Sequence, residues 1–203
     1  MKHLILFFFI CAFSFLQSCR RPKADTTVRT DDTTNAPSIP DQTFGEIEKE
    51  IERDPGNPEG WYKRGLLNYD NGDLTSAISD FTKALELDPQ LASAYHDRGI
   101  CKHELEDYDG ALSDYSEAIR IDPGFAEAYY NRAMLYDIRN DREKALADYN
   151  RTIELQPTFA PAYYNRGVYY FNFDRSKACE DFKKASDLGD KDAEKAYLQH
   201  CQK

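Results

Sequence analysis

A repeat of 34 residues is the feature that most constrains how this 203-residue chain can fold. The segment 126–157 reads AEAYYNRAMLYDIRNDREKALADYNRTIELQP. Shifted back by 34 positions it aligns with segment 92–123, shifted forward it aligns with the residues from Ala160 onward, and a further copy begins at Pro58. A unit of this length cannot bury its apolar face alone, so successive copies must stack on one another.

Each copy contains two stretches with apolar residues at helical spacing, separated by a polar turn. In the first stretch a large aromatic residue precedes a small residue by four positions, which places both on one helix face. These pairs are Trp61 and Gly65, Tyr95 and Gly99, Tyr129 and Ala133, and Tyr163 and Gly167. In the second stretch an alanine precedes Phe81, Tyr115, Tyr149 or Phe182 by four. The pattern predicts paired helices in which the small residue lets another helix approach closely.

These small and large positions resemble the tetratricopeptide repeat (TPR) over residues 58–188. The resemblance implies an all-α, right-handed solenoid of helix-turn-helix units with a C-terminal capping helix. The expected parts are a half repeat at 44–55, full repeats at 58–91, 92–125, 126–159 and 160–189, and a cap helix at 190–203. The fourth copy lacks one residue in its inner turn, and its first helix is expected over 160–173. Thr152 replaces the expected alanine, which predicts a small loss of packing.

Every copy carries an arginine where many TPRs carry leucine, followed by an aspartate 16 residues later, or 15 in the fourth copy. The pairs are Arg64 and Asp80, Arg98 and Asp114, Arg132 and Asp148, and Arg166 and Asp181. One hypothesis is a row of arginines that grips an anionic ligand. The joint recurrence favours the alternative, a structural ladder of Arg–Asp pairs between packed helices, because a guanidinium suits fixed bidentate pairing with a carboxylate.

Residues 1–18 have the pattern of a secretory signal. Lys2 precedes an apolar run over 4–16 that is shorter than the ~20 residues needed to span a bilayer. The sequence LQSC at 16–19 resembles a bacterial lipobox, and this resemblance implies that Cys19 becomes the mature N-terminus and carries acyl chains such as palmitate. The alternatives are ordinary secretion with cleavage nearby and an N-terminal membrane anchor.

The stretch between Cys19 and the repeats is expected to be a disordered tether. Residues 20–43 contain six threonines and three prolines and little apolar content. A flexible chain of this length has a root-mean-square reach of ~25–30 Å, enough to hold the repeats away from a membrane.

The net charge of the chain is −10, and because the tether is neutral the excess negative charge lies in the repeats. A strongly acidic solenoid argues against nucleic acid as a partner, since phosphates attract a basic surface. It also argues against repeats lying directly on an anionic membrane, so we expect membrane contact through the N-terminal lipid only. Basic or neutral protein segments remain as partners.

The cysteines outside the signal divide by position. Cys179 and Cys201 are equidistant from the turn at Gly189-Asp190, so they should lie level in an antiparallel helical hairpin. In an oxidising compartment this predicts a disulfide that staples the cap helix to the array; the alternative is two buried free thiols. Cys101 should be a lone buried thiol.

No catalytic motif stands out, and the chain is expected to be non-enzymatic with no cofactor. It has no phosphate-binding glycine loop, no G-x-S-x-G, no H-E-x-x-H and no C-x-x-C. His96 and His103 are seven residues apart, which lacks the i, i+4 spacing of a metal-binding pair, so we expect no metal site. Two solvated histidines on a groove wall are the preferred interpretation.

The expected binding site is the concave surface, which in the TPR family is lined by the first helix of each repeat. Asn131 and Asn165, one period apart, resemble the asparagine ladder with which long TPR arrays clasp a peptide backbone, and an amide can bond a peptide unit in both senses. The alternative is that they are ordinary family residues. The full set of expected groove residues is Tyr62, Tyr95, His96, Tyr130, Asn131, Met134, Tyr164, Asn165 and Val168.

Together these features predict a membrane-anchored adaptor of the bacterial cell envelope that binds a peptide or helix of a partner protein. The outer membrane is favoured over the inner one, with the repeats exposed to the periplasm or the cell surface. A self-associating structural scaffold is the alternative function.

Overall fold

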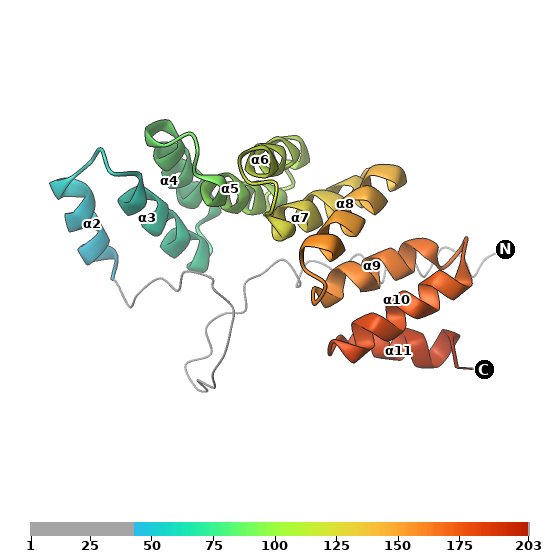
Figure 1. The fold of residues 1–203 in the computed structure, drawn as a ribbon. Coiled ribbons are helices and arrows are strands. Elements are labelled where there is room, and N and C mark those ends of the chain that lie inside the picture. The colour runs from blue at the N-terminus through green and yellow to red at the C-terminus, as the bar shows by residue number, and fades with distance from the viewer. Residues whose placement is uncertain (1–42, 203) are drawn as a thin grey trace.

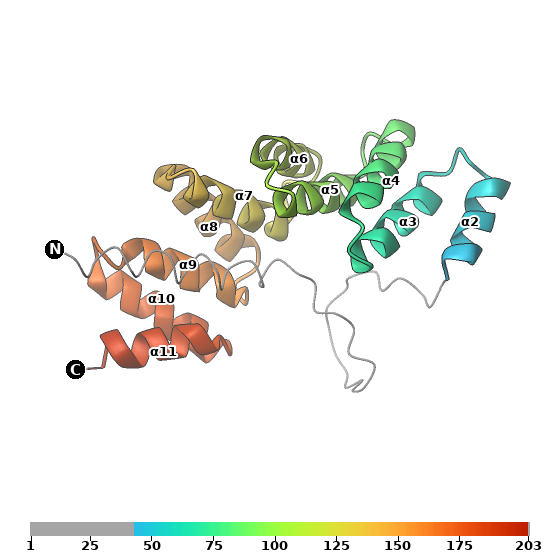
Figure 2. The same cartoon turned by 180° about the vertical axis from the view of Figure 1, so that it is seen from behind.

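The structure, a computed structural model, describes residues 43–202, and this part of the chain contains ten helices and no strand. Figures 1 and 2 show the helices following one another along a curved row that runs from α2 at one end to α11 at the other. The helices are α2 (Phe44–Arg53), α3 (Pro58–Asp70), α4 (Leu74–Leu87), α5 (Ala92–Glu104), α6 (Tyr108–Ile121), α7 (Ala126–Ile138), α8 (Arg142–Leu155), α9 (Ala160–Tyr170), α10 (Arg175–Asp187) and α11 (Lys191–His200). The signal, Cys19 and the tether lie outside the described residues.

The helices alternate between two roles. We call α3, α5, α7 and α9 the first helices and α4, α6, α8 and α10 the second helices of repeats one to four. In both views α3 and α5 lie on the inner side of the curve, while α4 and α6 lie on its outer side. The all-α solenoid expected from the sequence is therefore the fold, and α2 and α11 flank the four complete repeats.

Aspartates start most of the second helices. The side chains of Asp73, Asp107 and Asp174 each accept a hydrogen bond from the backbone N–H three residues later, which satisfies a donor that has no partner inside the helix. Asp141 stands at the same place in repeat three, but its carboxylate contacts Lys144 Nζ at 2.6 Å instead. At the other end, α4 and α6 stop at the Asp-Pro pairs Asp88-Pro89 and Asp122-Pro123, since the residue before proline avoids helical geometry.

The turn between the two helices of a repeat changes at repeat four. In repeats one to three it contains one residue at positive φ: Gly72 at 81°, Glu106 at 63° and Asn140 at 59°. The residue deleted from repeat four is the one that would occupy this left-handed position. α9 accordingly ends at Tyr170 rather than at 173 as expected, because a tighter turn, with the Asp174 N–H bonded to Tyr170 O at 2.8 Å, takes the remaining residues.

The repeating core contact joins the small residue of a first helix to the aromatic ring of its second helix. A Cβ atom on Gly65 would lie 2.6 Å from the Phe81 ring, and one on Gly99 would lie 2.7 Å from the Tyr115 ring. Real contacts are never this short, so glycine is what allows the two helices to pack at this distance. In repeat three the same place holds Ala133 against Tyr149, and both are almost completely buried.

Thr152, at the position of the expected alanine, is fully buried. Its hydroxyl lies 3.0 Å from Asp148 O in its own helix and 3.3 Å from Ala126 O at the start of α7, so it can donate to either carbonyl. The expected loss of packing is therefore offset, because the added hydroxyl is hydrogen-bonded rather than stranded in the core.

The arginines of repeats two to four each bond side chains of two other helices. Arg132 on α7 donates to both carboxylate oxygens of Asp148 on α8, at 2.8 and 3.0 Å, while its third nitrogen lies 3.3 Å from Ser116 Oγ on α6. The other repeats pair Arg64 with Asp80, Arg98 with Asp114 and Arg166 with Asp181 in the same bidentate way.

A link to the preceding repeat, which the sequence analysis missed, completes the bonds of the arginines in repeats two to four. Arg98 donates to Thr82 Oγ1 at 3.0 Å and Arg166 to Asn150 Oδ1 at 2.7 Å. These partners lie 16 residues before their arginine, as the aspartates lie 16 or 15 after it. Because both edges of the guanidinium are occupied within the array in repeats two to four, and Asp80 takes one edge in repeat one, the geometry favours the structural ladder over the anion-gripping row.

The cap helix α11 rests against α10 and is joined to it by a disulfide. Cys179 and Cys201 have an S–S distance of 1.97 Å and a Cα–Cα distance of 5.6 Å, so the structure pairs the two cysteines that the hairpin geometry predicts. Cys101 is buried and free. Ala193 is the one fully buried residue of α11. Because packing buries so little of this helix, the disulfide contributes much of what holds it against α10.

Candidate partner-binding surface

The first helices present one continuous surface, which we call the first-helix surface. It consists of the residues that stand 2, 5, 6, 9, 12 and 13 positions after the N-caps Asn57, Leu91, Phe125 and Phe159. In repeats one to four these residues are Glu59, Tyr62, Lys63, Leu66, Tyr69 and Asp70; Ser93, His96, Asp97, Ile100, His103 and Glu104; Glu127, Tyr130, Asn131, Met134, Asp137 and Ile138; and Pro161, Tyr164, Asn165, Val168, Phe171 and Asn172. These positions recur at helical spacing and so share one side of each helix.

Hydrogen bonds 35 residues apart in sequence join neighbouring first helices across this surface. The Tyr62 hydroxyl donates to Asp97 Oδ2 at 2.7 Å, and Tyr69 donates to Glu104 Oε1 at 2.8 Å. Farther along, Asn165 Nδ2 donates to the Tyr130 hydroxyl at 3.1 Å. The inner side of the array is therefore held by side-chain bonds between every pair of adjacent first helices, including the one described next.

His96 joins α5 to α7. Its Nε2 lies 2.9 Å from Asn131 Nδ2, and its Nδ1 lies 3.1 Å from Asp97 Oδ1. Since the amide N–H faces Nε2, that nitrogen accepts and Nδ1 carries the proton that is donated to the carboxylate. His96 is 8% exposed and His103 is 9% exposed, so the expectation of two solvated histidines is wrong. Aromatic neighbours cover both rings: the ring centres of Phe125 and His96 are 4.6 Å apart, and those of Tyr108 and His103 are 5.8 Å apart.

The expected groove residues divide into three groups. Six are buried: Tyr62, His96, Tyr130, Asn131, Met134 and Asn165. Tyr164 is half-buried, and Val168 is 41% exposed on the same side of α9. Tyr95 does not belong to this surface, because it precedes His96 by one residue and packs against the core residues Ala118, Ile119 and Ala128. The amides of Asn131 and Asn165 are engaged by neighbouring side chains, and a role for them in clasping a peptide stays a prediction.

A row of large apolar residues on this side of the array was missed by the sequence analysis. Leu91, Phe125 and Phe159 stand one period apart, each immediately before a first helix, and all are half-buried. Phe125 packs on His96, and the Phe159 ring lies 4.9 Å from the Tyr130 ring. The 34-residue spacing of these residues could have revealed them. Phe125 and Phe159 pack against His96 and Tyr130, whose side chains join neighbouring first helices.

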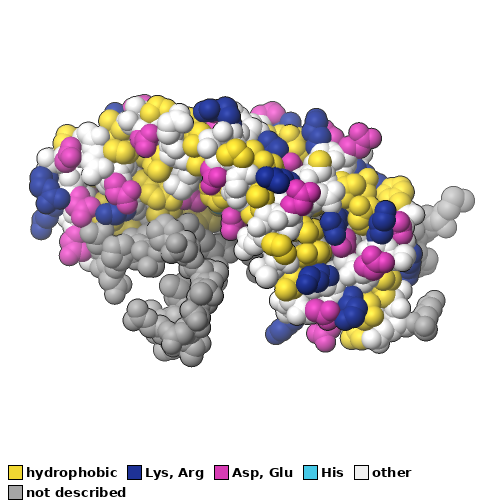
Figure 3. All heavy atoms as spheres, in the orientation of Figure 1, with side chains coloured by type: hydrophobic (Ala, Val, Ile, Leu, Met, Phe, Trp, Pro, Cys, Tyr) yellow, Lys and Arg dark blue, Asp and Glu magenta, His cyan; other side chains and the backbone are white. Residues whose placement is uncertain are grey.

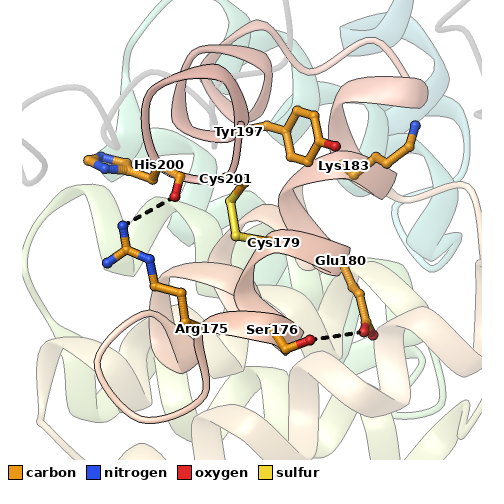
Figure 4. A pocket seen from close by; sticks show the side chains of 8 residues that line it. All are labelled: Arg175, Ser176, Cys179, Glu180, Lys183, Tyr197, His200 and Cys201. Carbon is orange, nitrogen blue, oxygen red and sulfur yellow. Dashed lines mark hydrogen bonds between the residues drawn. A yellow bond between two sulfur atoms is a disulfide. The ribbon is translucent and has the colours of Figure 1, made fainter. Parts of the chain in front are cut away.

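An open cleft lies between α10 and α11, with the disulfide between its walls (Figure 4). Arg175 Nη2 donates to His200 O at 3.2 Å across one end, and Lys183 lies 6.0 Å from the centre of the Tyr197 ring at the other. The lining combines cations with Glu180, whose carboxylate lies 3.5 Å from the Ser176 hydroxyl (Figure 4).

The described residues contain no group of three or more His, Cys, Asp or Glu side chains that could hold a metal ion. Within the same part of the chain, no helix has both the length and the apolar character required to cross a bilayer. Burial raises the pKa of the Cys101 thiol to about 12, so this cysteine stays protonated and unreactive at neutral pH.

Comparison with known proteins places this arrangement in a family. A family model described as "Tetratricopeptide repeat" matches residues 58–91 and 126–159, and another described as "TPR repeat" matches 102–137. A solved structure described as "Crystal structure of MamA" is 30% identical, with a TM-score of 0.66 over 74% of this chain and 88% of that one. The chain belongs to the tetratricopeptide repeat family.

Other solved TPR structures agree on the fold. A second MamA structure is 28% identical, with a TM-score of 0.63 over 78% of this chain and 85% of the other. MamA 41-end from Desulfovibrio magneticus RS-1 is 24% identical, with a TM-score of 0.64 over 71% and 82% of the two chains, and this likeness concerns the fold alone. No curated protein sequence matches the chain significantly. TPR domains generally bind protein partners, so the site to be sought is a protein-binding surface.

Proposed function

We propose that this TPR protein is a non-enzymatic adaptor, anchored to the bacterial cell envelope by lipid on Cys19, that binds a peptide or helix of a partner protein on the first-helix surface. Repeats two to four form the binding region. The outer membrane is the proposed location, with the repeats facing the periplasm or the cell surface.

The observation that carries the proposal is an exposed apolar area on an otherwise braced surface. Val168 is 41% exposed and Ile138 is 53% exposed. At the position of Val168, repeats one and two hold the buried Leu66 and the half-buried Ile100, and at the position of Ile138 they hold the acidic residues Asp70 and Glu104. The bonds between first helices hold the backbone beneath them in place, so a partner loses little free energy to reordering the surface. Exposed apolar side chains on a rigid concave surface fit a ligand's apolar anchor.

The binding surface can be tested by crosslinking in cells. The double variant Val168→Asn and Ile138→Asn should lose the partner captured by the wild type while it melts at nearly the same temperature, because both side chains are exposed. Leu105→Asn is the matched control, since Leu105 is 50% exposed but lies in the inner turn of repeat two. Capture that survives the double variant and is lost with Leu105→Asn would move the site to the turns.

The lipid anchor is tested separately. Cys19→Ala should release the protein from the membrane fraction, because two or three acyl chains contribute ~0.8 kcal/mol per buried methylene and nothing else in the proposal holds the protein there. Retention of Cys19→Ala in that fraction would contradict lipid anchoring at this residue.

Self-association is a second candidate function, favoured by Leu198. This residue is 51% exposed on α11, at the end of the array, where a further copy of the chain could pack. Light scattering over a dilution series separates the two functions, because a scaffold that associates through this end should dissociate on dilution and with Leu198→Asn.

A further inference from the structure

The charges on the first-helix surface differ from those on the rest of the array. Its exposed ionisable side chains are all carboxylates: Glu59, Asp70, Glu127 and Asp137. Among the described residues that make up the first-helix surface, Lys63 is the one lysine or arginine, and its ammonium already lies 3.4 Å from Glu50. Over the whole face of the molecule that Figure 3 presents, basic and acidic side chains are interspersed.

The apolar and acidic parts of the surface separate beyond α7, because α9 contributes no carboxylate to it. The exposed apolar residues Ile138 and Val168 come from the end of α7 and from α9. The exposed carboxylates come from α3 and α7, with half-buried Glu104 between them on α5. A ligand that crosses the first helices in order would therefore meet carboxylates over repeats one to three and an apolar area from the end of α7 to α9.

From this separation we infer that the partner segment is a cationic peptide with an apolar anchor at one end. This inference rests on the proposed function and names the chemical class of its ligand. Lysine or arginine side chains lie against Asp70 and Glu104 at the C-terminal ends of α3 and α5, and the anchor covers Val168 and Ile138. Glu59 and Glu127 add negative charge at the N-terminal ends of α3 and α7. An acidic peptide is rejected, because it would face a row of like charges.

The geometry also sets the spacing of the basic residues. Packed helices lie 8–10 Å apart, and an extended peptide advances about 3.3 Å per residue, so roughly every third residue meets a new repeat. The chain's overall negative charge adds long-range attraction that accelerates the encounter and weakens with salt.

Three synthetic probes test the inference by fluorescence anisotropy with the full-length chain. KSGKSGKSGLVF has basic residues at every third position and an apolar end, ESGESGESGLVF reverses the charge, and KSGKSGKSGSSS removes the anchor. Each is made in both chain directions. The first probe should bind in one direction, at least about tenfold more tightly than the other two, and should weaken as salt is raised.

Protein variants then locate the contact. Asp70→Lys and Glu127→Lys should each weaken the first probe by roughly threefold to tenfold, and Val168→Asn should weaken it as removal of the anchor does. Glu143→Lys is the matched control: Glu143 is an equally exposed carboxylate but lies on α8, so its reversal should leave binding unchanged.

Two results would overturn the inference. If the acidic probe binds as tightly as the basic one, or if Glu143→Lys weakens binding as much as Glu127→Lys, the surface does not select a cationic peptide. Neither result removes the proposed function, which is decided by whether partner capture in cells depends on Val168 and Ile138.

Discussion

At the scale of single residues, the arginine of each repeat carries the most concentrated set of interactions. Arg132 bonds Asp148 twice and Ser116 once, and its guanidinium lies 5.6 Å from the centre of the Tyr129 ring. Asp148 is 6% exposed, so it cannot recover in water the bonds that it loses when the arginine is removed.

Arg132→Ala should therefore destabilise the fold by about 3 kcal/mol, because it leaves a buried carboxylate unpaired. Thermal unfolding by circular dichroism measures the loss. Arg151→Ala is the control: Arg151 pairs with Glu154 on the exposed side of α8, and the melting temperature should hardly change. Equal losses in the two variants would contradict the structural ladder, and a loss of partner binding at unchanged stability would favour the anion-gripping row.

His103 gives the array a dependence on pH. Burial lowers the pKa of this histidine, and the nearby Glu104 carboxylate opposes part of that effect. The unfolded chain therefore takes up the proton more readily than the folded one, so stability is full above the unfolded pKa of about 6.5 and falls as the pH drops through the lower folded value.

His103→Gln should lose less stability than the wild type when the pH is lowered from about 7.5 to about 5. Urea unfolding of both proteins at each pH measures the difference, and the carboxylates common to both cancel in the comparison. An identical pH dependence in the two proteins would show that His103 does not contribute.

At the scale of elements, the turn between the two helices of each of repeats one to three depends on a single residue in the left-handed conformation. Gly72 has a φ of 81°, and no atom lies within 4 Å of where its Cβ would stand. A substitution there changes the backbone energy without any steric contact.

Gly72→Ala should destabilise the protein by about 1 kcal/mol, because alanine pays for the left-handed conformation that glycine adopts freely. Gly45→Ala is a control of opposite sign: Gly45 lies in α2 with the same open surroundings, and alanine there should stabilise by up to about 1 kcal/mol. Denaturant midpoints measure both, and changes of the same sign would refute the conformational explanation.

The cap helix depends on its covalent link. The disulfide joins residues 22 apart in sequence, and a closed loop of this size is worth about 3 kcal/mol in the chain-entropy model. The double variant Cys179→Ser and Cys201→Ser should let α11 exchange its amide hydrogens much faster, as should reduction of the wild type, while α5 and α7 stay protected. Protection of α11 that survives in both samples would mean that packing alone holds it.

At the scale of the whole molecule, stacking follows from the period. Each repeat contributes a small residue, an aromatic residue and an Arg–Asp pair at corresponding positions, so the same kind of contact joins the two helices of every repeat. Bonds from each later arginine to the preceding second helix, and from each first helix to the next, then connect neighbours. The result is a braced array whose inner surface keeps its shape before a partner arrives.

The sequence by itself determined the all-α solenoid, the four repeats, the Arg–Asp partners and the cysteine pairing, because each of these depends on spacing along a helix or across one turn. Only the tertiary structure decided which side chains remain in contact with solvent. His96, Asn131 and Asn165 look available on a helical projection, but the neighbouring first helix, 35 residues away, supplies partners that bury them. Helical periodicity says which side of one helix a residue occupies; only the distance between adjacent helices says whether that side is open, and at Val168 and Ile138 it is.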